Sequence, residues 1–438
     1  MFPNGPTSAT DLLLQNYQED PFGLLARCFK EYGDIFSLPL GTRGNESLGA
    51  NGRWVFLTRP EHIKQLFTES PDVVEAGKAN WILFGHLLPP QGSLGIDGEE
   101  HLERRRLILK PLQGDRMKIY TDTIRELTSQ MVSAWDERTP FSLFHHMQRI
   151  TIETIIKTVF GLADDRQAKH VCSRLMKVEQ AETSPEEQNA IMAEVSGFLS
   201  ETIRQNRRDG IEESRDDVFS ILLRSKDRQG RELSEAQLHD ELITLLIAGF
   251  GTTATMLCWA FECFLSFPGA ALKVKEELRV VLAGRPVEAG SIGSLEYLDA
   301  FIKEVFRFRP MIPSAGVRLL SRPIHLDGYD LPAGTMIANC PSILHMRPEI
   351  YPQPEAFKPE RFLGVKIDPY RWTPFGGGVR RCVGMFFALH EMKVVLATVT
   401  GMVDLALAQP VTKGVLQGPF YVPEGGPLVQ IQRRRTPS

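Results

Sequence analysis

Residues 375–384, F-G-G-G-V-R-R-C-V-G, carry the strongest signal in this chain, and a helical pattern follows them directly. Cys382 stands just before that helix, where the positive end of the macrodipole and unpaired N–H groups favour a thiolate. Arg380 and Arg381 add positive charge with the same effect. The run of glycines removes side chains around the sulfur, which gives a flat, bulky group access to the backbone. The stretch therefore predicts that Cys382 is an anionic ligand.

A glycine-rich turn before a helix can also hold a phosphate group. A phosphate-binding P-loop needs G-K-[ST] after its glycines, and R-R-C stands there instead, which excludes that interpretation. A thiolate ligand to haem iron fits the residues better. The other five cysteines form no C-x-x-C pair, and we expect them to be small buried residues: Cys28, Cys172, Cys258, Cys263 and Cys340.

The stretch matches F-x-x-G-x-R-x-C-x-G, the haem-binding signature of the cytochrome P450 superfamily, and the chain resembles the soluble bacterial branch of that family. Three more motifs follow the family's order and spacing: A-G-F-G-T-T at residues 248–253, E-x-x-R at 304–307 and P-E-R-F at 359–362. The resemblance implies a mainly α, triangular fold with small β-sheets. It also implies a helical lobe and a smaller β-containing lobe around haem, in one domain over residues 1–438.

The resemblance also implies roles for individual side chains. Cys382 is the expected iron ligand, and Phe375 belongs to the haem-binding loop. The expected partners of the haem b propionates are His101, Arg105, Arg318 and Arg380. The expected buried structural cluster behind the loop consists of Glu304, Arg307 and Arg361.

Arg104 and Arg106 flank Arg105, and we expect them to face solvent or to pair with acids.

The long-helix motif departs from the family at one position. The family commonly writes A-G-x-[DE]-T-[TS], where the acid and the following threonine deliver protons to dioxygen. Here Gly251 stands at the acid position, and Thr252 is retained. We expect both positions to affect catalysis, although a threonine in a helix also commonly bonds back to its own backbone.

Apolar residues fill the stretches that line the substrate pocket in this family. They predict a lipophilic small molecule such as a terpenoid, fatty acid, steroid or polyketide. Some lie in an expected loop before residue 98, and a core role for any one of them stays open. The set is Trp81, Leu83, Phe84, Leu87, Leu88, Ala248, Ile312, Ala315 and Val317.

The net charge restricts the partners of the protein. The chain has 438 residues, with 50 Lys and Arg against 54 Asp and Glu, so its formal charge is −4, and no global field would hold nucleic acid. No flavin or iron–sulfur segment is recognisable, so we expect electrons from a separate ferredoxin or flavodoxin. The expected docking cations are Arg371, Arg380, Arg381 and Lys393.

The N-terminal sequence M-F-P-N-G-P-T-S-A-T has no basic region followed by an apolar run, so we expect no signal peptide or membrane anchor and a cytoplasmic enzyme. Residues 242–261 form a charge-free window, which we interpret as a buried core helix.

Local patterns predict the main elements. Two β-prone runs at residues 34–40 and 54–58 indicate a hairpin, and Pro60 opens a helix through residue 67. Residues 99–267 are mainly helical, with the longest helix starting at Ser234, where Gln237 completes a capping box. Residues 324–338 indicate a small antiparallel sheet, and residues 384–400 a helix.

Two other functions stay open at this point. The first is a haem-thiolate enzyme that uses peroxide or rearranges an oxygenated substrate, which the glycine at position 251 favours. The second is a non-catalytic haem sensor.

Overall fold

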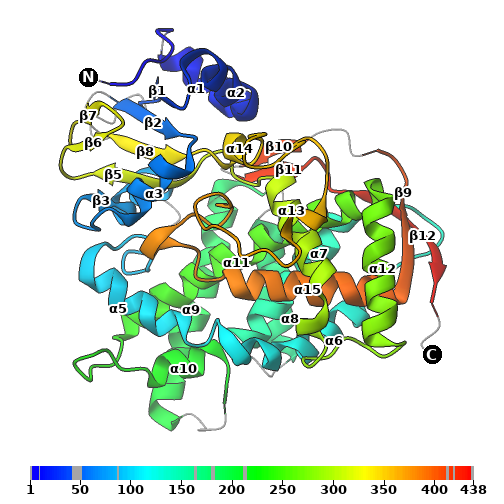
Figure 1. Cartoon of the computed structure of the whole chain (residues 1–438). Helices are drawn as coiled ribbons and strands as arrows, with labels where there is room; N and C mark the ends of the chain where they lie inside the picture. Colours follow the sequence, from blue (N-terminus) through cyan, green and yellow to red (C-terminus); the bar gives the residue numbers. More distant parts are fainter. Residues whose placement is uncertain are drawn as a thin grey trace. The chain divides into compact units, whose positions relative to one another are not determined.

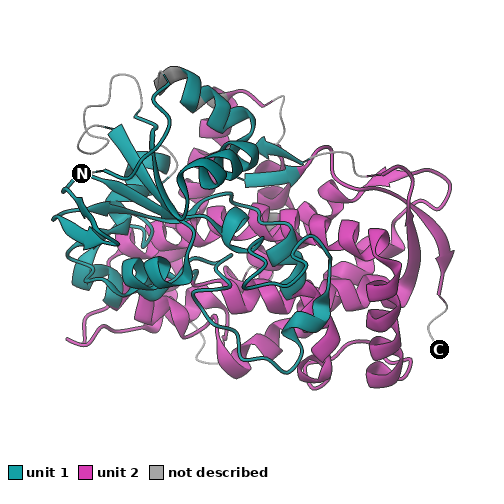
Figure 2. Cartoon of the chain, turned by 45° about the horizontal axis from the view of Figure 1, so that its top comes forward, with its two compact units in different colours: residues 1–102, 303–382, 414–422 teal, residues 103–302, 383–413, 423–438 magenta. Residues whose placement is uncertain are grey.

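The computed structural model describes residues 2–8, 10–41, 52–85, 88–161, 165–178, 183–210, 215–410, 414–417 and 420–435. The chain divides into two compact units, each assembled from separate stretches of sequence (Figure 2). Unit 1 comprises residues 1–102, 303–382 and 414–422, and unit 2 comprises residues 103–302, 383–413 and 423–438. The expectation of a single domain stays a prediction.

Unit 1 contains a five-stranded sheet in the order β1-β2-β8-β5-β3 (Figure 1). β1 and β2 are antiparallel, with Ile35 opposite Leu57, which confirms the predicted hairpin. β8 runs parallel to β2 and antiparallel to β5. The bounds are β1 (Ile35–Pro39), β2 (Arg53–Leu57), β3 (Val74–Glu75), β5 (Ala315–Leu320) and β8 (Met336–Asn339).

The period of two along β2 explains why this sheet is buried on both faces. Trp54 and Phe56 belong to one apolar cluster, and Val55 and Leu57 belong to a second. Two two-stranded sheets accompany it. In the first, the turn between the two strands contains Asp327, which has a φ of 47°. The two sheets are β6 (Ile324–Leu326) with β7 (Tyr329–Leu331), and β10 (Gly414–Gln417) with β11 (Phe420–Pro423).

The helices of unit 1 position the loop that precedes Cys382. Helix α3 begins at Pro60, as predicted. Helix α13 crosses the boundary of the units, as does α5. The helical segments are α1 (Thr10–Glu19), α2 (Pro21–Tyr32), α3 (Pro60–Thr68), α4 (Ala76–Phe84), α5 (Gly98–Leu109), α13 (Glu296–Phe308), α14 (Pro341–Leu344), η4 (Pro359–Phe362) and η5 (Gly378–Arg380).

Unit 2 is mainly helical and also holds the sheet β4-β12-β9. Its strands are β4 (Phe141–Ser142), β9 (Val403–Leu407) and β12 (Leu428–Arg434). Its helices are η2 (Gly114–Ile119), α6 (Tyr120–Ser133), α7 (Leu143–Thr158), α8 (Asp165–Val178), α9 (Pro185–Asp209), α10 (Val218–Arg224), α11 (Glu235–Ser266), α12 (Pro268–Leu282), η3 (Ile292–Ser294) and α15 (Met385–Met402).

Helix α11 has the predicted start and end. The Gln237 backbone N–H donates to the Ser234 hydroxyl at 3.1 Å, and the Ser234 N–H donates to the Gln237 side chain at 3.0 Å, so the capping box is present. The helix ends at Ser266, and Pro268 starts the next one. Helices α11 and α15 are long and apolar enough to cross a membrane, but 67% of the apolar window of each is buried in the protein, as in a core helix.

Candidate functional site

The loop before Cys382 needs its glycines for two physical reasons. Gly376 and Gly378 have φ angles of 64° and 63°, in the left-handed region that side chains disfavour. A Cβ atom on Gly377 would lie 2.1 Å from the Phe67 ring, and one on Gly378 would lie 2.2 Å from the Phe67 carbonyl oxygen. The three glycines therefore allow this loop to pack directly on α3.

Cys382 differs from the other cysteines in its environment. It is exposed, whereas the other five are buried, and all six are free thiols within the described residues. Burial raises the pKa of Cys28 to about 11 and that of Cys172 to about 12, which keeps both protonated. The Cys382 N–H donates to the Phe375 carbonyl at 3.0 Å, and α15 begins three residues later. The loop thus presents one accessible sulfur next to a helix N-terminus.

An aromatic cluster holds the start of the loop. The Phe375 ring lies 4.7 Å from Phe306 and 5.8 Å from Trp372, measured between ring centroids. The Trp372 indole N–H donates to the Lys303 carbonyl at 3.2 Å, which ties the cluster to α13. Phe375 is therefore fixed by packing and by hydrogen bonding of its neighbours.

Glu304 and Arg307 form a bidentate pair at 2.6 and 2.7 Å, and both side chains are fully buried. Arg361 lies 3.5 Å from the same carboxylate, so the three residues of the predicted cluster are adjacent. Arg307 also donates to the carbonyls of His345 and Pro354, at 2.9 and 2.8 Å. These bonds hold the irregular segment before the loop against α13.

Arg318 is a buried cation in an environment that suits an anionic ligand. The residue is 5% exposed, and its guanidinium donates to the carbonyls of Val317 and Gly377 and lies over the Phe67 ring. Within the described residues no carboxylate pairs with it, and burial lowers its pKa to about 9, with a further contribution from Arg380. A buried guanidinium needs a charged partner, so this donor set fits a carboxylate such as a haem propionate.

Arg380 is held by the segment that precedes α5. It donates to the Ser93 carbonyl at 3.1 Å and to the Ile96 carbonyl at 2.5 Å, and it pairs with the Asp97 carboxylate. His101, in the first turn of α5, is also buried. Cys382, Phe375, Arg380, Arg318 and His101 thus all belong to unit 1. Asp97 was not singled out from the sequence, although an acid directly before a glycine and a helix is a recognisable signal.

The remaining predicted catalytic residues belong to unit 2 and lie on α11. The Thr252 hydroxyl donates to the Ala248 carbonyl at 2.8 Å, which is the back-bonded geometry. Gly251 precedes it and is half-buried. Thr151 of α7 donates to the Phe250 carbonyl at 3.1 Å, a contact that the sequence did not indicate. The backbone of α11 beside Gly251 is therefore bonded from its own helix and from α7.

Arg104 and Arg105 also belong to unit 2, and they differ in burial. Arg104 is 2% exposed, and it lies 3.4 Å from Glu241 of α11, so it pairs with an acid and does not face solvent. Arg106 pairs with Glu103 at 3.1 Å. Arg105, the predicted propionate partner, is half-buried.

The comparison with known proteins decides the family. The sequence matches the family model described as Cytochrome P450 over residues 3–401. The chain belongs to the cytochrome P450 family. Putative cytochrome P450 135B1 of Mycobacterium bovis and Mycobacterium tuberculosis is 33% identical over 431 residues, which cover 94% of this chain and 87% of the relative. Putative cytochrome P450 135A1 of Mycobacterium tuberculosis is 31% identical, with 92% and 90% covered.

Solved structures show the same fold. Retinoic acid-bound cyanobacterial CYP120A1 superimposes with a TM-score of 0.85 at 21% identity, over 99% of both chains. The cytochrome P450DA haem domain gives 0.83 at 22% identity, over 100% of this chain and 98% of that one. The expected cytochrome P450 fold, mainly α with small sheets, is confirmed. This cytochrome P450 is a haem- and iron-binding monooxygenase that uses O2 and a redox partner.

The structure corrects one expectation about the substrate pocket of this cytochrome P450. Trp81, Leu83 and Phe84 lie on helix α4 and not in a loop; residues 76–84 contain no proline, and Ala, Lys and Leu favour helix at four of the nine positions. Leu83 and Val317 pack against an apolar cluster of unit 1. Ala315 is buried, Leu88 and Ile312 are half-buried, and Ala248 is exposed within helix α11; Leu87 lies outside the described residues.

The four expected docking cations differ in exposure and in ion pairing. Lys393 lies 2.5 Å from Asp299 and is 16% exposed, and Arg380 pairs with Asp97, so neither presents a free charge on the surface. Arg371 is more than half exposed, although it lies 3.5 Å from Asp368. Arg381 is half-buried, and burial lowers its pKa. Of the four, Arg371 is the most exposed.

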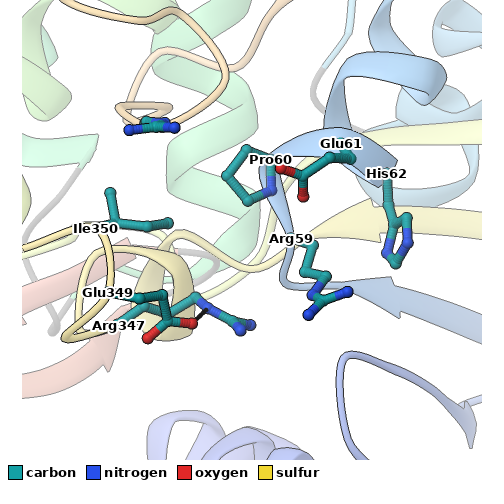
Figure 3. Close-up of a pocket in the computed structure, with 8 residues that line it drawn as sticks. Arg59, Pro60, Glu61, His62, Arg347, Glu349 and Ile350 are labelled. Atoms are coloured by element: carbon teal, nitrogen blue, oxygen red, sulfur yellow. Dashed lines mark hydrogen bonds and ion pairs between the residues drawn. The ribbon is translucent and has the colours of Figure 1, made fainter.

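Unit 1 also contains a pocket of about 300 Å³ (Figure 3). Of the site and docking residues predicted from the sequence, Arg371 is the one that lines it. Its charges are matched, because Arg59 pairs with Asp34 and Arg347 pairs with Glu349. It is lined by Arg59, Pro60, Glu61, His62, Arg347, Glu349, Ile350 and Arg371. A pocket of balanced charge does not suit a lipophilic substrate.

Proposed function

We propose that this cytochrome P450 inserts one oxygen atom from O2 into a lipophilic small molecule, with haem b as its prosthetic group and Cys382 as the axial ligand. The observation that carries this proposal is the loop of residues 375–384, which presents Cys382, the one exposed cysteine among the described residues, at a helix N-terminus. Haem bound through a thiolate supplies O2 activation, because the thiolate donates electron density that favours O–O cleavage.

The proposed roles of the other residues follow from their charge and burial. Arg318 and Arg380 bind the propionates together with His101 and Arg105, and the buried Arg318 guanidinium supports this because it has no carboxylate partner in the described residues. Phe375 packs at the start of the loop. The ion-paired cluster that holds the preceding segment consists of Glu304, Arg307 and Arg361.

The proposed substrate is lipophilic, such as a terpenoid, fatty acid, steroid or polyketide. Support comes from the apolar character of α4 and of the segment before β5, where Trp81, Phe84 and Ile312 have few polar neighbours in sequence. Trp81 is 37% exposed, as a residue at an accessible apolar wall would be.

The proposed electron donor is a separate acidic ferredoxin or flavodoxin in the cytoplasm. The exposed guanidinium of Arg371 and the neighbouring Arg381 would attract its acidic surface. Charge reversal at Arg371 should lower the rate of electron transfer at low ionic strength and weaken its salt dependence.

Gly251 favours one second candidate, a peroxide-driven or rearranging haem-thiolate enzyme. The proton relay lacks its usual carboxylate there, while Thr252 still provides a hydroxyl. A purified, haem-loaded enzyme should be supplied with NADPH and surrogate ferredoxin and reductase, or with hydrogen peroxide alone. Product only in the first mixture supports the monooxygenase, and product only in the second supports the peroxide-driven enzyme.

The same preparation separates an enzyme from a haem sensor. Screening lipophilic compounds for a low-to-high-spin absorbance change identifies candidate substrates. Absence of both a spin change and a product across the library would favour the sensor.

A further inference from the structure

Asp97 joins three structural elements of unit 1. Its carboxylate accepts the backbone N–H groups of Gly77 and Lys78 at 2.8 and 2.9 Å, in the first turn of α4. Its carbonyl accepts the N–H of His101 at 3.4 Å, in the first turn of α5. Its carboxylate also pairs with the Arg380 guanidinium, two residues before Cys382.

The cap on α4 comes from outside the local sequence. Glu75 stands at the N-cap position of α4, but its side chain makes no capping hydrogen bond. Asp97, about twenty residues later, supplies the carboxylate that satisfies two of the free N–H groups of this helix. A Cβ atom on Gly77 would lie 2.7 Å from the Asp97 carboxylate, so the glycine makes room for this contact.

The environment of Arg380 depends on the same residue. The Arg380 side chain is 10% exposed, and it donates to the Ser93 and Ile96 carbonyls and to the Asp97 carboxylate. Asp97 provides the formal negative charge among them, and its charge also raises the pKa of the buried Arg318, against the effect of Arg380. The Asp97 carboxylate therefore pairs with Arg380, and its charge also acts on Arg318, with which it forms no ion pair within the described residues.

We propose that Asp97 is a positioning residue for haem binding, which fixes the Arg380 guanidinium for a propionate and links it to the N-terminus of α4. This inference rests on the proposed role of Arg380. In this role Asp97 acts through Arg380 and not on a reacting group. Because it contacts both Arg380 and the N-terminus of α4, it also fixes α4, which carries proposed substrate-pocket residues, relative to the haem-binding loop. Residues that orient the ligands of a bound metal commonly change metal affinity about 10- to 100-fold, and we expect an effect of that size for a residue that orients a propionate partner.

The test compares haem loss from Asp97→Asn and from wild type, measured as transfer of haem to an excess of apomyoglobin. Asparagine keeps an oxygen that can cap α4 but removes the charge that pairs with Arg380. We expect haem loss to accelerate about 10- to 100-fold. We also expect the midpoint potential of the haem to rise, because a nearby negative charge is lost.

Asp20→Asn is a matched control, because Asp20 also caps a helix of unit 1, accepts the Gly23 N–H at 2.9 Å, and lies 3.8 Å from Arg27. Its haem-loss rate and midpoint potential should stay at the wild-type values. Gly77→Ala is a second variant if Asp97→Asn folds poorly, because its added Cβ atom would lie too close to the Asp97 carboxylate and displace it. It should also accelerate haem loss.

The double variant Asp97→Asn/Arg380→Ala tests whether Asp97 acts through Arg380. We expect it to lose haem at the rate of Arg380→Ala alone. If the effects of the two substitutions on the haem-loss rate add, or if Asp97→Asn loses haem within twofold of the wild-type rate, Asp97 only caps α4 and the positioning role is wrong. If Arg380→Ala itself retains haem normally while Asp97→Asn does not, the proposed role of Arg380 is wrong and the positioning role with it.

Discussion

The Glu304 carboxylate accepts hydrogen bonds from the Nε and an Nη group of Arg307, at 2.6 and 2.7 Å, and neither side chain is exposed to solvent. Arg361 approaches the same carboxylate, and the Lys358 backbone N–H donates to it at 2.8 Å. One buried acid thus joins α13 to the segment that leads to the Cys382 loop.

Glu304→Gln should therefore destabilise the protein strongly, because it leaves Arg307 buried without its carboxylate. Removing one partner of a buried ion pair costs about 3–5 kcal/mol. Urea unfolding followed by circular dichroism measures this cost. Glu276→Gln is the control, since Glu276 and Arg279 form a solvent-exposed pair with the same spacing at 2.6 Å, and it should leave the midpoint unchanged. Equal effects of the two substitutions would contradict a role for burial.

Cys382→Ala should abolish thiolate ligation of haem. The reduced carbon monoxide complex of the wild type should show the red-shifted Soret band of a thiolate-ligated haem, and the variant should lack it. Cys340→Ala serves as the control, because burial raises the pKa of Cys340 well above its ordinary value. Persistence of the shifted band in Cys382→Ala would mean that another residue is the ligand.

Short-range patterns predicted much of this molecule. The Ser234–Gln237 capping box and the glycines before Cys382 act within a few residues, so their geometry can be inferred from spacing alone. The Asp97–Arg380 and Arg104–Glu241 pairs join residues more than 100 positions apart, and only folding reveals them. The Lys393–Asp299 ion pair is also remote in sequence, so the local pattern around Lys393 did not indicate it.

Arg104→Ala and Arg105→Ala should have different effects. Arg104→Ala removes the buried partner of Glu241 and should lower the free energy of unfolding by about 3–5 kcal/mol. Arg105→Ala should lower haem retention with a smaller loss of stability, because Arg105 is half-buried. Urea unfolding and haem transfer measure the two effects separately. A double variant, Arg104→Leu/Glu241→Leu, should recover stability. Equal haem loss for both single variants would place the helix register off by one residue.

Stability should depend on pH through Glu391 of α15. Burial is the main cause that raises its pKa from 4.5 to about 8, and the Thr154 hydroxyl acts in the opposite direction. The folded protein then holds a proton that the unfolded chain has released, so stability falls as the pH rises from about 4.5 to about 8, and levels off above.

Glu391→Gln should remove this contribution. The stability difference between variant and wild type should grow across that window, with a slope of up to about 1.4 kcal/mol per pH unit. The neighbouring His390, whose pKa burial lowers to about 4, is present in both proteins and cancels in the difference. Urea unfolding at a series of pH values measures the slope, and a difference independent of pH would show that Glu391 is ionised in the folded protein.

Gly251 and Thr252 should control how efficiently NADPH electrons reach product. A carboxylate that delivers protons is typically worth a factor of about 100 to 10,000 in rate. Gly251→Asp should raise the ratio of product to NADPH consumed and lower hydrogen peroxide release. Thr252→Ala should do the reverse, because it removes the hydroxyl that now bonds to the Ala248 carbonyl. Both ratios are measured with surrogate redox partners.

Gly251→Asn is the matched control for the last prediction, because it adds nearly the same volume without an ionisable group. Aspartate and asparagine have similar helix propensities, both only slightly better than that of glycine, so the two substitutions share the backbone contribution to stability. An effect of aspartate that asparagine does not reproduce therefore reports proton delivery. If aspartate changes nothing while Thr252→Ala abolishes coupling, another donor already serves Thr252. If neither substitution changes product formation and peroxide alone supports turnover, the proposed monooxygenase reaction gives way to the peroxide-driven one.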